Sequence, residues 1–412
     1  MTPTTTTTTA EIVAQAKQVL IGNYARLPVV MQRGEGCWVW DTDGRKYLDL
    51  FAGFGGCVLG HCHPELIDAA TEQAKTLWHV GNTFYTLPQI RLGEHLRKHA
   101  FDGRAFFCHS GLEANEAAVK LARLHGARWA QEHGGPKKWQ VISLHRSFHG
   151  RSLAMVAATG NPAVKAGFEP QVPGFTQVEL GDLEGLVAAV TPETASIMVE
   201  PIQGEGGIHI VPNEYARELR KLCDAHGILL HFDEVWTGCG RTGRWFGHQH
   251  LVQADGTVIR PDIMTLGKAI GGGLPVGVMW ARPELAELLV PGKHGCTLGA
   301  NGICMAVAAK VFDVIERDDL VTHARVLGEH AIARLKNTKS IAAKVAGVRG
   351  KGLFLGVEFK EEPKDFVLKG LEKGVILNLT QKTVCRIAPP INISRDEWDL
   401  GLDRLIGVIE SL

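Results

Sequence analysis

Short, unbroken apolar runs recur between residues 61 and 301, with helix-forming segments between them, and no other feature constrains the fold as strongly. The runs fall at residues 105–108, 140–143, 195–199, 228–232, 263–266 and 276–280. A strand with one solvent-exposed face alternates polar and apolar residues, whereas a strand buried on both faces is apolar throughout. We therefore predict an α/β fold in which a mostly parallel sheet is sandwiched by helices. A ligand site is expected at the carboxyl ends of these strands.

Four stretches of different character divide the 412-residue chain. Residues 1–10 are threonine-rich with little to bury, so we predict a disordered tail. Over residues 11–60 a helical segment precedes a strand pair with an Asp43-Gly44 turn, and we expect this segment to join a small domain. Residues 61–301 form the large domain that holds the parallel sheet. Residues 302–412 contain two helical stretches and then strands, which predicts a smaller α/β domain.

Charge and cysteine content exclude several classes of function. Lys plus Arg and Asp plus Glu each total 44, so the overall charge favours neither nucleic acid nor an anionic membrane as a partner. There is no apolar run of the ~18 residues that a membrane span needs, and no secretory leader is evident. Nine scattered cysteines without a C-x-x-C pair indicate reduced thiols and a cytoplasmic protein. His61-Cys62-His63 lacks a second ligand pair, so we predict no metal site.

Two charged residues follow two of the apolar runs. Asp233 comes after the run at 228–232, and Lys268 comes after the run at 263–266. A carboxylate in this position also suits magnesium beside a phosphate loop, but the chain has no G-x-x-x-x-G-K-[ST] motif. The G-x-G-x-x-G match at 238–243 is not followed by a convincing helix, which weakens a dinucleotide interpretation. Pyridoxal phosphate needs both groups, an amine for its aldehyde and a carboxylate for its pyridine nitrogen.

Other strand ends also carry polar or glycine-rich loops. Ser110 and Gly111 precede a strong helix and are typical of either a phosphate site or an ordinary helix cap. Phe148 and Arg151 share one loop and suit a planar anionic ligand. A phenylalanine packed in the core and an arginine exposed to solvent explain the same pattern equally well. Glu205 lies in a glycine-rich loop after the run at 195–199. Together these loops indicate a single site, which none of them indicates alone.

The motifs, taken in order, resemble those of class III pyridoxal-phosphate aminotransferases of fold type I, nearest to the acetylornithine and ornithine group. The resemblance covers nearly the whole chain after Ala10. It rests on residues 23–24, 59–64, 110–115, 147–151, 200–207, 233–235, 240–243, 267–268 and 386–390. This resemblance implies the fold, the cofactor pyridoxal 5'-phosphate and a set of cofactor contacts. Lys268 would form the Schiff base, and Asp233 would pair with the pyridine nitrogen. The remaining contacts that it implies are Phe148 and Val235 on the ring faces, and Ser110, Gly111, Leu112 and Thr297 at the phosphate.

Substrate contacts follow from the same resemblance. Arg386 would bind the substrate α-carboxylate and Arg151 the distal carboxylate of 2-oxoglutarate or glutamate, while Glu205 would screen Arg386 when a distal amine enters. Tyr24 and Phe54 are further substrate-binding candidates. Thr297 would reach the phosphate of the neighbouring subunit, which implies a homodimer. The implied activity is ping-pong transfer of the distal amino group of N-acetylornithine to 2-oxoglutarate, giving glutamate and a semialdehyde in arginine biosynthesis.

Some positions depart from the family pattern. Trp236 stands where glutamine is common, Leu112 replaces a small residue, and Phe54 matches neither the tyrosine of ornithine enzymes nor the frequent isoleucine of acetylornithine enzymes. Ornithine, 4-aminobutyrate, succinyl-diaminopimelate or another ω-amino acid therefore stay open as donors. A noncatalytic pyridoxal-phosphate-binding regulator is the alternative from a different class.

Overall fold

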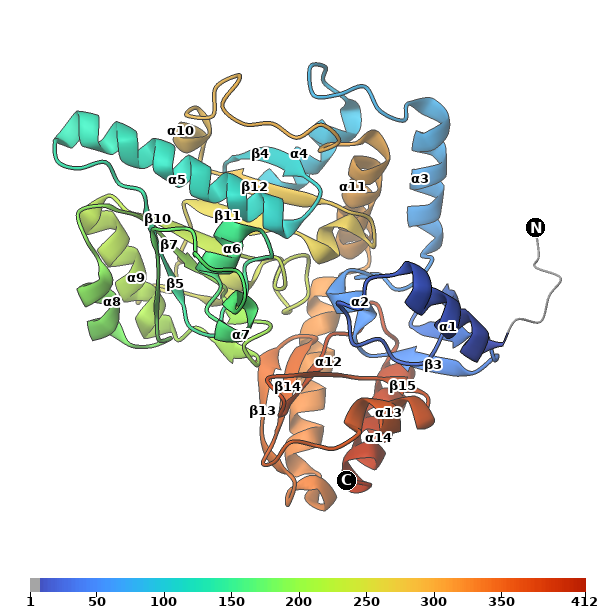
Figure 1. Ribbon diagram of the computed structural model, residues 1–412. Coiled ribbons are helices and arrows are strands. Elements are labelled where there is room, and N and C mark those ends of the chain that lie inside the picture. Colours follow the sequence, from blue (N-terminus) through green and yellow to red (C-terminus); the bar gives the residue numbers. More distant parts are fainter. Residues whose placement is uncertain (1–7) are drawn as a thin grey trace.

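A seven-stranded sheet forms the centre of the computed structural model, which describes residues 8–412 (Figure 1). Its strand order is β4-β12-β11-β10-β7-β5-β6. Strand β12 runs antiparallel to both neighbours, and the pairs from β11 to β6 are parallel. The strands are β4 (Arg104–Cys108), β5 (Gln140–Leu144), β6 (Phe175–Val178), β7 (Thr194–Val199), β10 (Leu229–Asp233), β11 (Ile263–Leu266) and β12 (Gly277–Ala281). The predicted mostly parallel sheet is confirmed.

Helices cover both faces of this sheet, as its unbroken apolar strands require. Leu229 packs with small residues of α5 (Gly111–His133), such as Ala114. The next residue, Leu230, points the other way and packs with Leu219 of α9 (Asn213–His226). Adjacent residues of β10 are thus both fully buried, because each face has its own helical layer. The predicted helix sandwich is confirmed.

One strand of the central sheet was not predicted. Strand β6 lies at the edge of the sheet, and only Val178 at its end is buried. An edge strand that is partly exposed needs no continuous apolar run, so its sequence lacks the signal that marked the other six. The remaining elements of the region are α6 (Leu153–Ala158), α7 (Pro162–Lys165), α8 (Leu183–Ala189), β8 (Ile202–Gln203), β9 (His209–Ile210), η1 (Gly247–His250), η2 (Lys268–Gly271) and α10 (Pro283–Ala286), η marking 3-10 helices.

The N-terminal segment pairs with the C-terminal part of the chain. Strand β3 runs parallel to β15, which closes a second sheet of order β1-β2-β3-β15. Helix α1 begins at Thr9 with a Thr8 cap, so residues 8–10 of the expected tail are ordered, whereas residues 1–7 lie outside the described part. The elements of this segment are α1 (Thr9–Val19), β1 (Met31–Glu35), β2 (Trp38–Asp41), β3 (Lys46–Asp49) and α2 (Ala52–Gly55). The region after residue 60 begins with α3 (Pro64–Thr76) and α4 (Leu87–His99).

The C-terminal part contains a third sheet, of order β13-β14-β17-β16. Its elements are α11 (Gly302–Arg317), α12 (Leu320–Asn337), η3 (Lys339–Ile341), β13 (Val345–Lys351), β14 (Phe354–Phe359), α13 (Phe366–Glu372), β15 (Val375–Ile376), β16 (Asn378–Thr380), β17 (Val384–Ile387) and α14 (Arg395–Glu410). Residues 302–412 thus mix helices and strands, and the exact domain limits stay a prediction. Among residues 8–412, no helix has both the length and the hydropathy to cross a bilayer.

Candidate active site

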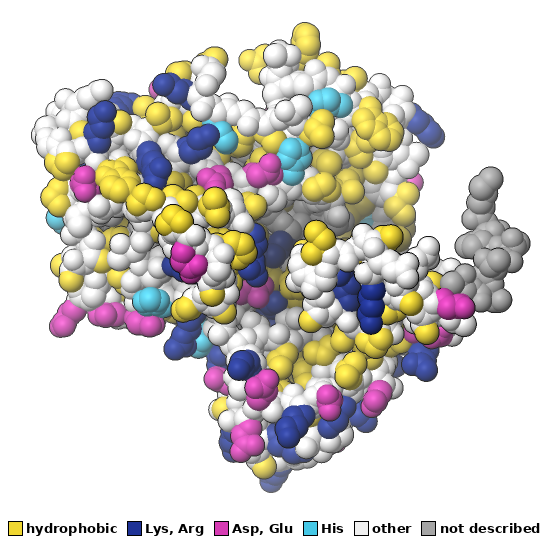
Figure 2. Space-filling model, in the orientation of Figure 1, with side chains coloured by type: hydrophobic (Ala, Val, Ile, Leu, Met, Phe, Trp, Pro, Cys, Tyr) yellow, Lys and Arg dark blue, Asp and Glu magenta, His cyan; other side chains and the backbone are white. Residues whose placement is uncertain are grey.

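The carboxyl ends of β10 and β11 open into a cavity of about 500 Å³. Asp233 is the last residue of β10, and Lys268 opens η2 directly after β11. The two strands are parallel neighbours, with Asp233 opposite Thr265, so both charged side chains reach the same edge of the sheet. Figure 2 shows a hollow in the middle of the face drawn, with charged side chains at its rim. Eight predicted site residues line the cavity: Ser110, Gly111, Leu112, Phe148, Arg151, Asp233, Val235 and Lys268.

Asp233 is buried and fully engaged. His149 Nδ1 and Asn115 Nδ2 each donate to its Oδ2 at 2.8 Å, and the Val235 N–H donates to Oδ1 at 3.1 Å. Thr265 in turn fixes the Asn115 amide by donating to its Oδ1 at 2.6 Å. Burial raises the pKa of Asp233, but hydrogen bonds from His149 and the Val235 N–H, together with electrostatic interactions with His149 and His231, hold the pKa below its usual value. The cavity therefore has a fixed negative charge at its base.

Lys268 lies against an aromatic ring in a strained backbone conformation. Its φ of 46° is in the left-handed region that side chains disfavour, and its Nζ lies 4.3 Å from the centre of the Trp236 ring. Loss of water around the ammonium lowers the pKa of Lys268 to about 8, while Asp233 and Glu205 oppose that shift and Arg386 adds to it. A lysine with this pKa carries a sizeable neutral fraction near neutral pH, which a nucleophilic amine needs.

The N-terminus of α5 faces the same cavity. Ser110 caps this helix by accepting the Glu113 N–H at 3.3 Å. A Cβ on Gly111 would lie 2.4 Å from a Val235 methyl, and one on Gly267 would lie 2.9 Å from the Gly111 nitrogen. Only glycines allow the helix start, the Asp233 loop and the Lys268 turn to approach so closely. Free N–H groups at the start of a long helix form a favourable site for a phosphate.

A buried ion pair lies beside Lys268. The Arg386 side chain is 1% exposed, donates from Nη1 to Glu205 Oε1 at 2.7 Å, and donates from Nε to Asn378 at 3.1 Å. Glu205 is 29% exposed and lies in the flexible glycine-rich loop. Its side chain can therefore move out of the ion pair more readily than that of Arg386. The guanidinium carbon lies 5.1, 5.9 and 4.6 Å from the ring centres of Phe51, Phe54 and Trp236.

Five predicted residues do not line the cavity of the single chain: Tyr24, Phe54, Glu205, Thr297 and Arg386. Glu205 and Arg386 form the ion pair described above, whereas Tyr24 and Thr297 are exposed. Phe54 does not line the cavity either but packs on Phe51 beside Arg386. Arg151 is exposed at the rim, with its guanidinium 5.4 Å from the Phe148 ring. The predicted roles of all of these residues stay predictions.

Three polar residues of the site had no predicted role. His149 and Asn115 hold Asp233, and buried Glu200 accepts the N–H groups of Phe148 and Gly204 at 3.1 Å each. Burial raises the pKa of Glu200 to about 7. All three lie within the motifs that carry the family resemblance, which was the only signal for them. Their contacts join residues far apart in sequence, so spacing alone could not reveal them.

Trp236 is buried between two glycines. Its ring stacks on Phe354 with centroids 5.2 Å apart. A Cβ on Gly55 would lie 2.7 Å from the indole, and one on Gly204 would lie 2.5 Å from it. The unusual tryptophan is therefore accommodated by its neighbours, and it forms a shared wall for Lys268 and Arg386.

Comparison with known proteins assigns this arrangement to a family. The family model described as aminotransferase class-III matches residues 21–409. The chain belongs to the class III aminotransferases. An acetylornithine aminotransferase of Myxococcus xanthus is 44% identical over 393 residues, or 95% of this aminotransferase and 96% of that protein. Another acetylornithine aminotransferase, from Methanocaldococcus jannaschii, is 43% identical over 384 residues, or 93% and 94% of the two chains.

Solved structures agree with the family assignment. An ornithine aminotransferase of Toxoplasma gondii, described with partial occupancy of pyridoxal phosphate at its active site, superposes with a TM-score of 0.90. It is 30% identical, and the match covers 98% of this chain and 95% of that one. The aminotransferase described here is accordingly a pyridoxal-phosphate-dependent enzyme of fold type I. Its cavity fits the cofactor, because a carboxylate, an amine and a helix N-terminus with a glycine cradle converge on a volume suited to such a ligand.

Uptake of cofactor should depend on pH through Lys268. Because its pKa is about 8, the neutral fraction of the amine increases as pH rises through that value. We expect the rate at which pyridoxal phosphate enters the apoenzyme to rise with pH and level off above pH 8 to 9. Absorbance changes of the cofactor after rapid mixing would measure this rate. A midpoint near the free-lysine value of about 10.4 would contradict the assigned pKa.

Proposed function

We propose that the enzyme transfers the distal amino group of N-acetylornithine to 2-oxoglutarate by a ping-pong mechanism. The observation that carries this proposal is the Arg386–Glu205 pair beside Lys268. The distal ammonium group of the donor would be repelled by an unpaired Arg386 guanidinium. Pairing with the Glu205 carboxylate neutralises the guanidinium and removes that repulsion. The two relatives that are 43% and 44% identical bear the name acetylornithine aminotransferase, whereas the ornithine aminotransferase is 30% identical, which favours N-acetylornithine over ornithine. Arginine biosynthesis is the pathway that we propose.

The second substrate would use Arg386 in its free form. A dicarboxylic keto acid has no distal amine and presents two carboxylates, so Glu205 must move away before one of them can pair with Arg386. The flexible glycine-rich loop permits that movement. Arg151 at the rim would take the other carboxylate. One site thereby accepts two substrates of different charge in turn.

The other residues have separable tasks in this proposal. Pyridoxal phosphate supplies an aldehyde that bonds amines and a ring that withdraws electrons. Asp233, held ionised by His149, would keep positive charge on the ring nitrogen. Lys268 would hold the cofactor aldehyde at rest and, once released, carry a proton between the substrate carbon and the aldehyde carbon of the cofactor, for which its pKa of about 8 is suited. Phe148 and Val235 would flank the ring, and Ser110, Gly111 and Leu112 would bind the phosphate.

A donor panel tests the proposed activity. Purified enzyme with pyridoxal phosphate and 2-oxoglutarate is supplied separately with N-acetylornithine, ornithine, 4-aminobutyrate and succinyl-diaminopimelate, and glutamate is measured. We expect the highest kcat/KM with N-acetylornithine. A clear preference for another donor would replace the proposed substrate while leaving the transaminase assignment intact. No glutamate from any donor would refute the proposed activity.

Replacing Arg151 by alanine should affect one half-reaction selectively. We expect kcat/KM for 2-oxoglutarate to fall roughly 10- to 100-fold, the loss typical of one charge-assisted hydrogen bond, with cofactor affinity nearly unchanged. Single-turnover absorbance measurements separate the two half-reactions. Arg146→Ala, an exposed arginine of the same loop, is the matched control. Equal 2-oxoglutarate rates in wild type and Arg151→Ala would contradict the assigned role.

We further propose a homodimer. The segment after α3 exposes large apolar side chains, among them Trp78, Phe84 and Tyr85, the last 92% exposed. Such a concentration is typical of a surface that another chain covers. Thr297 is also exposed, as expected if it serves a partner's site. Nine unpaired cysteines support the proposed cytoplasmic location, where thiols stay reduced.

Light scattering would test the dimer. We expect twice the chain mass of 44.7 kDa for the wild type. Tyr85→Asp should shift the enzyme towards monomer, because a charge desolvated in an apolar interface is unfavourable. Phe168→Asp changes an exposed aromatic side chain elsewhere and should leave the mass unchanged. A wild-type mass of one chain would contradict the proposal.

A further inference from the structure

Two histidines one turn apart on α4 face two acids on α11. His95 and His99 are on the first helix, and Asp313 and Glu316 are on the second. One ligand atom from each of His95, His99 and Glu316 lies within 4.8 Å of the other two. Imidazole and carboxylate are the ligand types that zinc-like ions prefer. This cluster is separate from the His61-Cys62-His63 sequence, in which His61 Nε2 makes a hydrogen bond with Asp49 at 2.8 Å.

His99 has a buried nitrogen without a hydrogen-bond partner. Its side chain is only 8% exposed, and its Nε2 makes no hydrogen bond although Glu316 Oε2 lies 3.4 Å away. The ring stacks on Trp245 with centroids 3.7 Å apart, which keeps it from turning towards solvent. A buried polar atom in this condition is unusual in a folded protein and indicates that a partner belongs there.

The spacing of these atoms suits a metal ion. Two ligands about 2.0 to 2.1 Å from a tetrahedral zinc ion are about 3.3 Å apart, close to the separation of His99 Nε2 and Glu316 Oε2. A hydrogen bond between the same atoms would be shorter.

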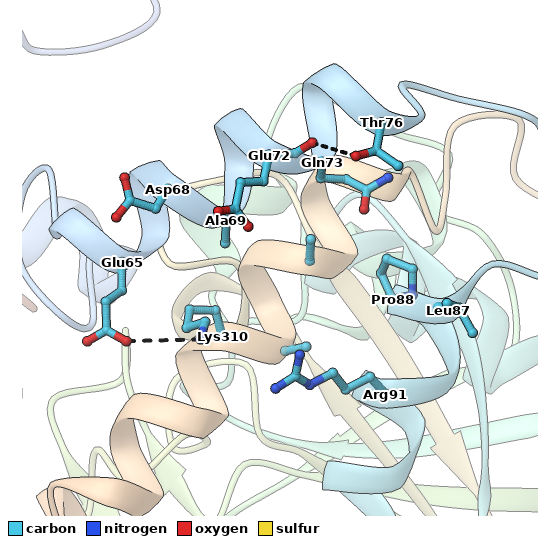
Figure 3. A pocket seen from close by; sticks show the side chains of 12 residues that line it. Glu65, Asp68, Ala69, Glu72, Gln73, Thr76, Leu87, Pro88, Arg91 and Lys310 are labelled. Carbon is cyan, nitrogen blue, oxygen red and sulfur yellow. Dashed lines mark hydrogen bonds and ion pairs between the residues drawn. The ribbon is translucent and has the colours of Figure 1, made fainter.

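The surrounding cations leave one carboxylate oxygen available. Asp313 is occupied, since it accepts from Arg91 at 2.7 Å and from His95 Nε2 at 3.0 Å, with Lys310 3.5 Å away. Figure 3 shows Arg91 and Lys310 reaching into the groove beside this cluster from α4 and α11. Lys98 pairs with Oε1 of Glu316 and leaves Oε2 towards His99. Three cations thus face two carboxylates, so binding of a metal ion would rest mainly on the imidazoles.

We propose that His95, His99 and Glu316 form a binding site for one divalent transition-metal ion of the zinc type, with water in the fourth position. The ion would clamp α4 to α11. Helix α11 also supports the Lys268 turn, because its Val307 and Val311 surround Gly272 just after η2. The proposal does not depend on the amino donor or on transaminase activity.

Titration of the metal-free holoenzyme tests the site. Calorimetry with Zn²⁺ alone should show one equivalent per chain, and Zn²⁺ should raise Tm. His99→Gln should weaken this binding by more than the roughly 10- to 100-fold that loss of an outer partner of a ligand causes. Glu316→Gln, a change at the exposed acid, should reduce the rise in Tm that Zn²⁺ causes. His226→Gln, an exposed histidine of α9, is the matched control and should bind as the wild type does.

Two results would overturn the proposal. One is Zn²⁺ binding by the wild type that is no tighter than binding by the His95→Gln/His99→Gln double variant. The other is a Co²⁺ spectrum with a sulfur-to-metal charge-transfer band that Cys296→Ser removes, because the ion would then occupy the His109–Glu113–Cys296 cluster instead.

Discussion

Replacing Lys268 by alanine is expected to lower turnover by about 10⁴-fold or more, since the chain loses its resting partner for the cofactor and its proton carrier together. No other lysine lines the cavity within residues 8–412. Borohydride reduction of the wild type, followed by peptide mass spectrometry, should place the trapped cofactor on Lys268. The alanine variant should trap none, although the helix N-terminus still offers a phosphate site and noncovalent binding should persist.

Lys165 supplies the matched control for this experiment. Burial lowers the pKa of Lys165 as well, but its Nζ donates to Gln177 at 2.6 Å and it is not among the residues that line the cavity. Lys165→Ala should therefore keep wild-type turnover per bound cofactor. Trapping at any lysine other than Lys268 in the wild type would refute the assignment.

Asp233→Asn is expected to lower kcat by about 10² to 10³-fold, the range seen when one preorganised electrostatic partner is removed. The asparagine side chain has the same shape as that of Asp233, so it still fills the space beside His149 and Asn115. It lacks the negative charge that these two residues stabilise. Without that charge the ring nitrogen of the cofactor would lose its proton more easily. Stopped-flow absorbance of each half-reaction and equilibrium binding of pyridoxal phosphate measure the two effects.

Asp262→Asn provides the comparison for a purely structural aspartate. Asp262 is buried just before β11, where it pairs with Arg220 at 3.0 Å and Arg282 at 3.1 Å, at the opposite end of the strand from the cavity. Its loss should lower Tm, because it leaves Arg220 without its buried partner, while turnover per folded site stays constant. Turnover of Asp233→Asn within about threefold of wild type would contradict the electrostatic role.

The sequence was most informative where neighbouring residues carry the signal. The run at 228–232 predicts a covered strand, and Asp233 follows it at once, so strand and candidate carboxylate were found together. Strand β6 was missed because an edge strand with exposed residues has no such run. The partners of Asp233 were missed because Asn115 lies on α5 and His149 in the loop after β5, and only the folded chain brings the three together.

Some site features depend on contacts that local sequence does not encode. Arg386 and Glu205 are 181 positions apart, and their predicted coupling came from family resemblance rather than spacing. His95 and His99 are recognisable as one face of a helix, but Glu316 arrives from another helix far along the chain. Tyr24 and Thr297 lie outside the cavity of a single chain, so their roles stay predictions.

The close fit of Trp236 between Gly55 and Gly204 also restricts the order in which substitutions at these three positions could have arisen during evolution. An alanine at position 55 or 204 would place its Cβ 2.7 or 2.5 Å from the indole. The tryptophan is therefore compatible only with a background in which both glycines are already present, and once it is there neither glycine can easily be replaced. Engineers who alter this wall need to change all three positions together, and single-site libraries at 55 or 204 should return mostly destabilised variants.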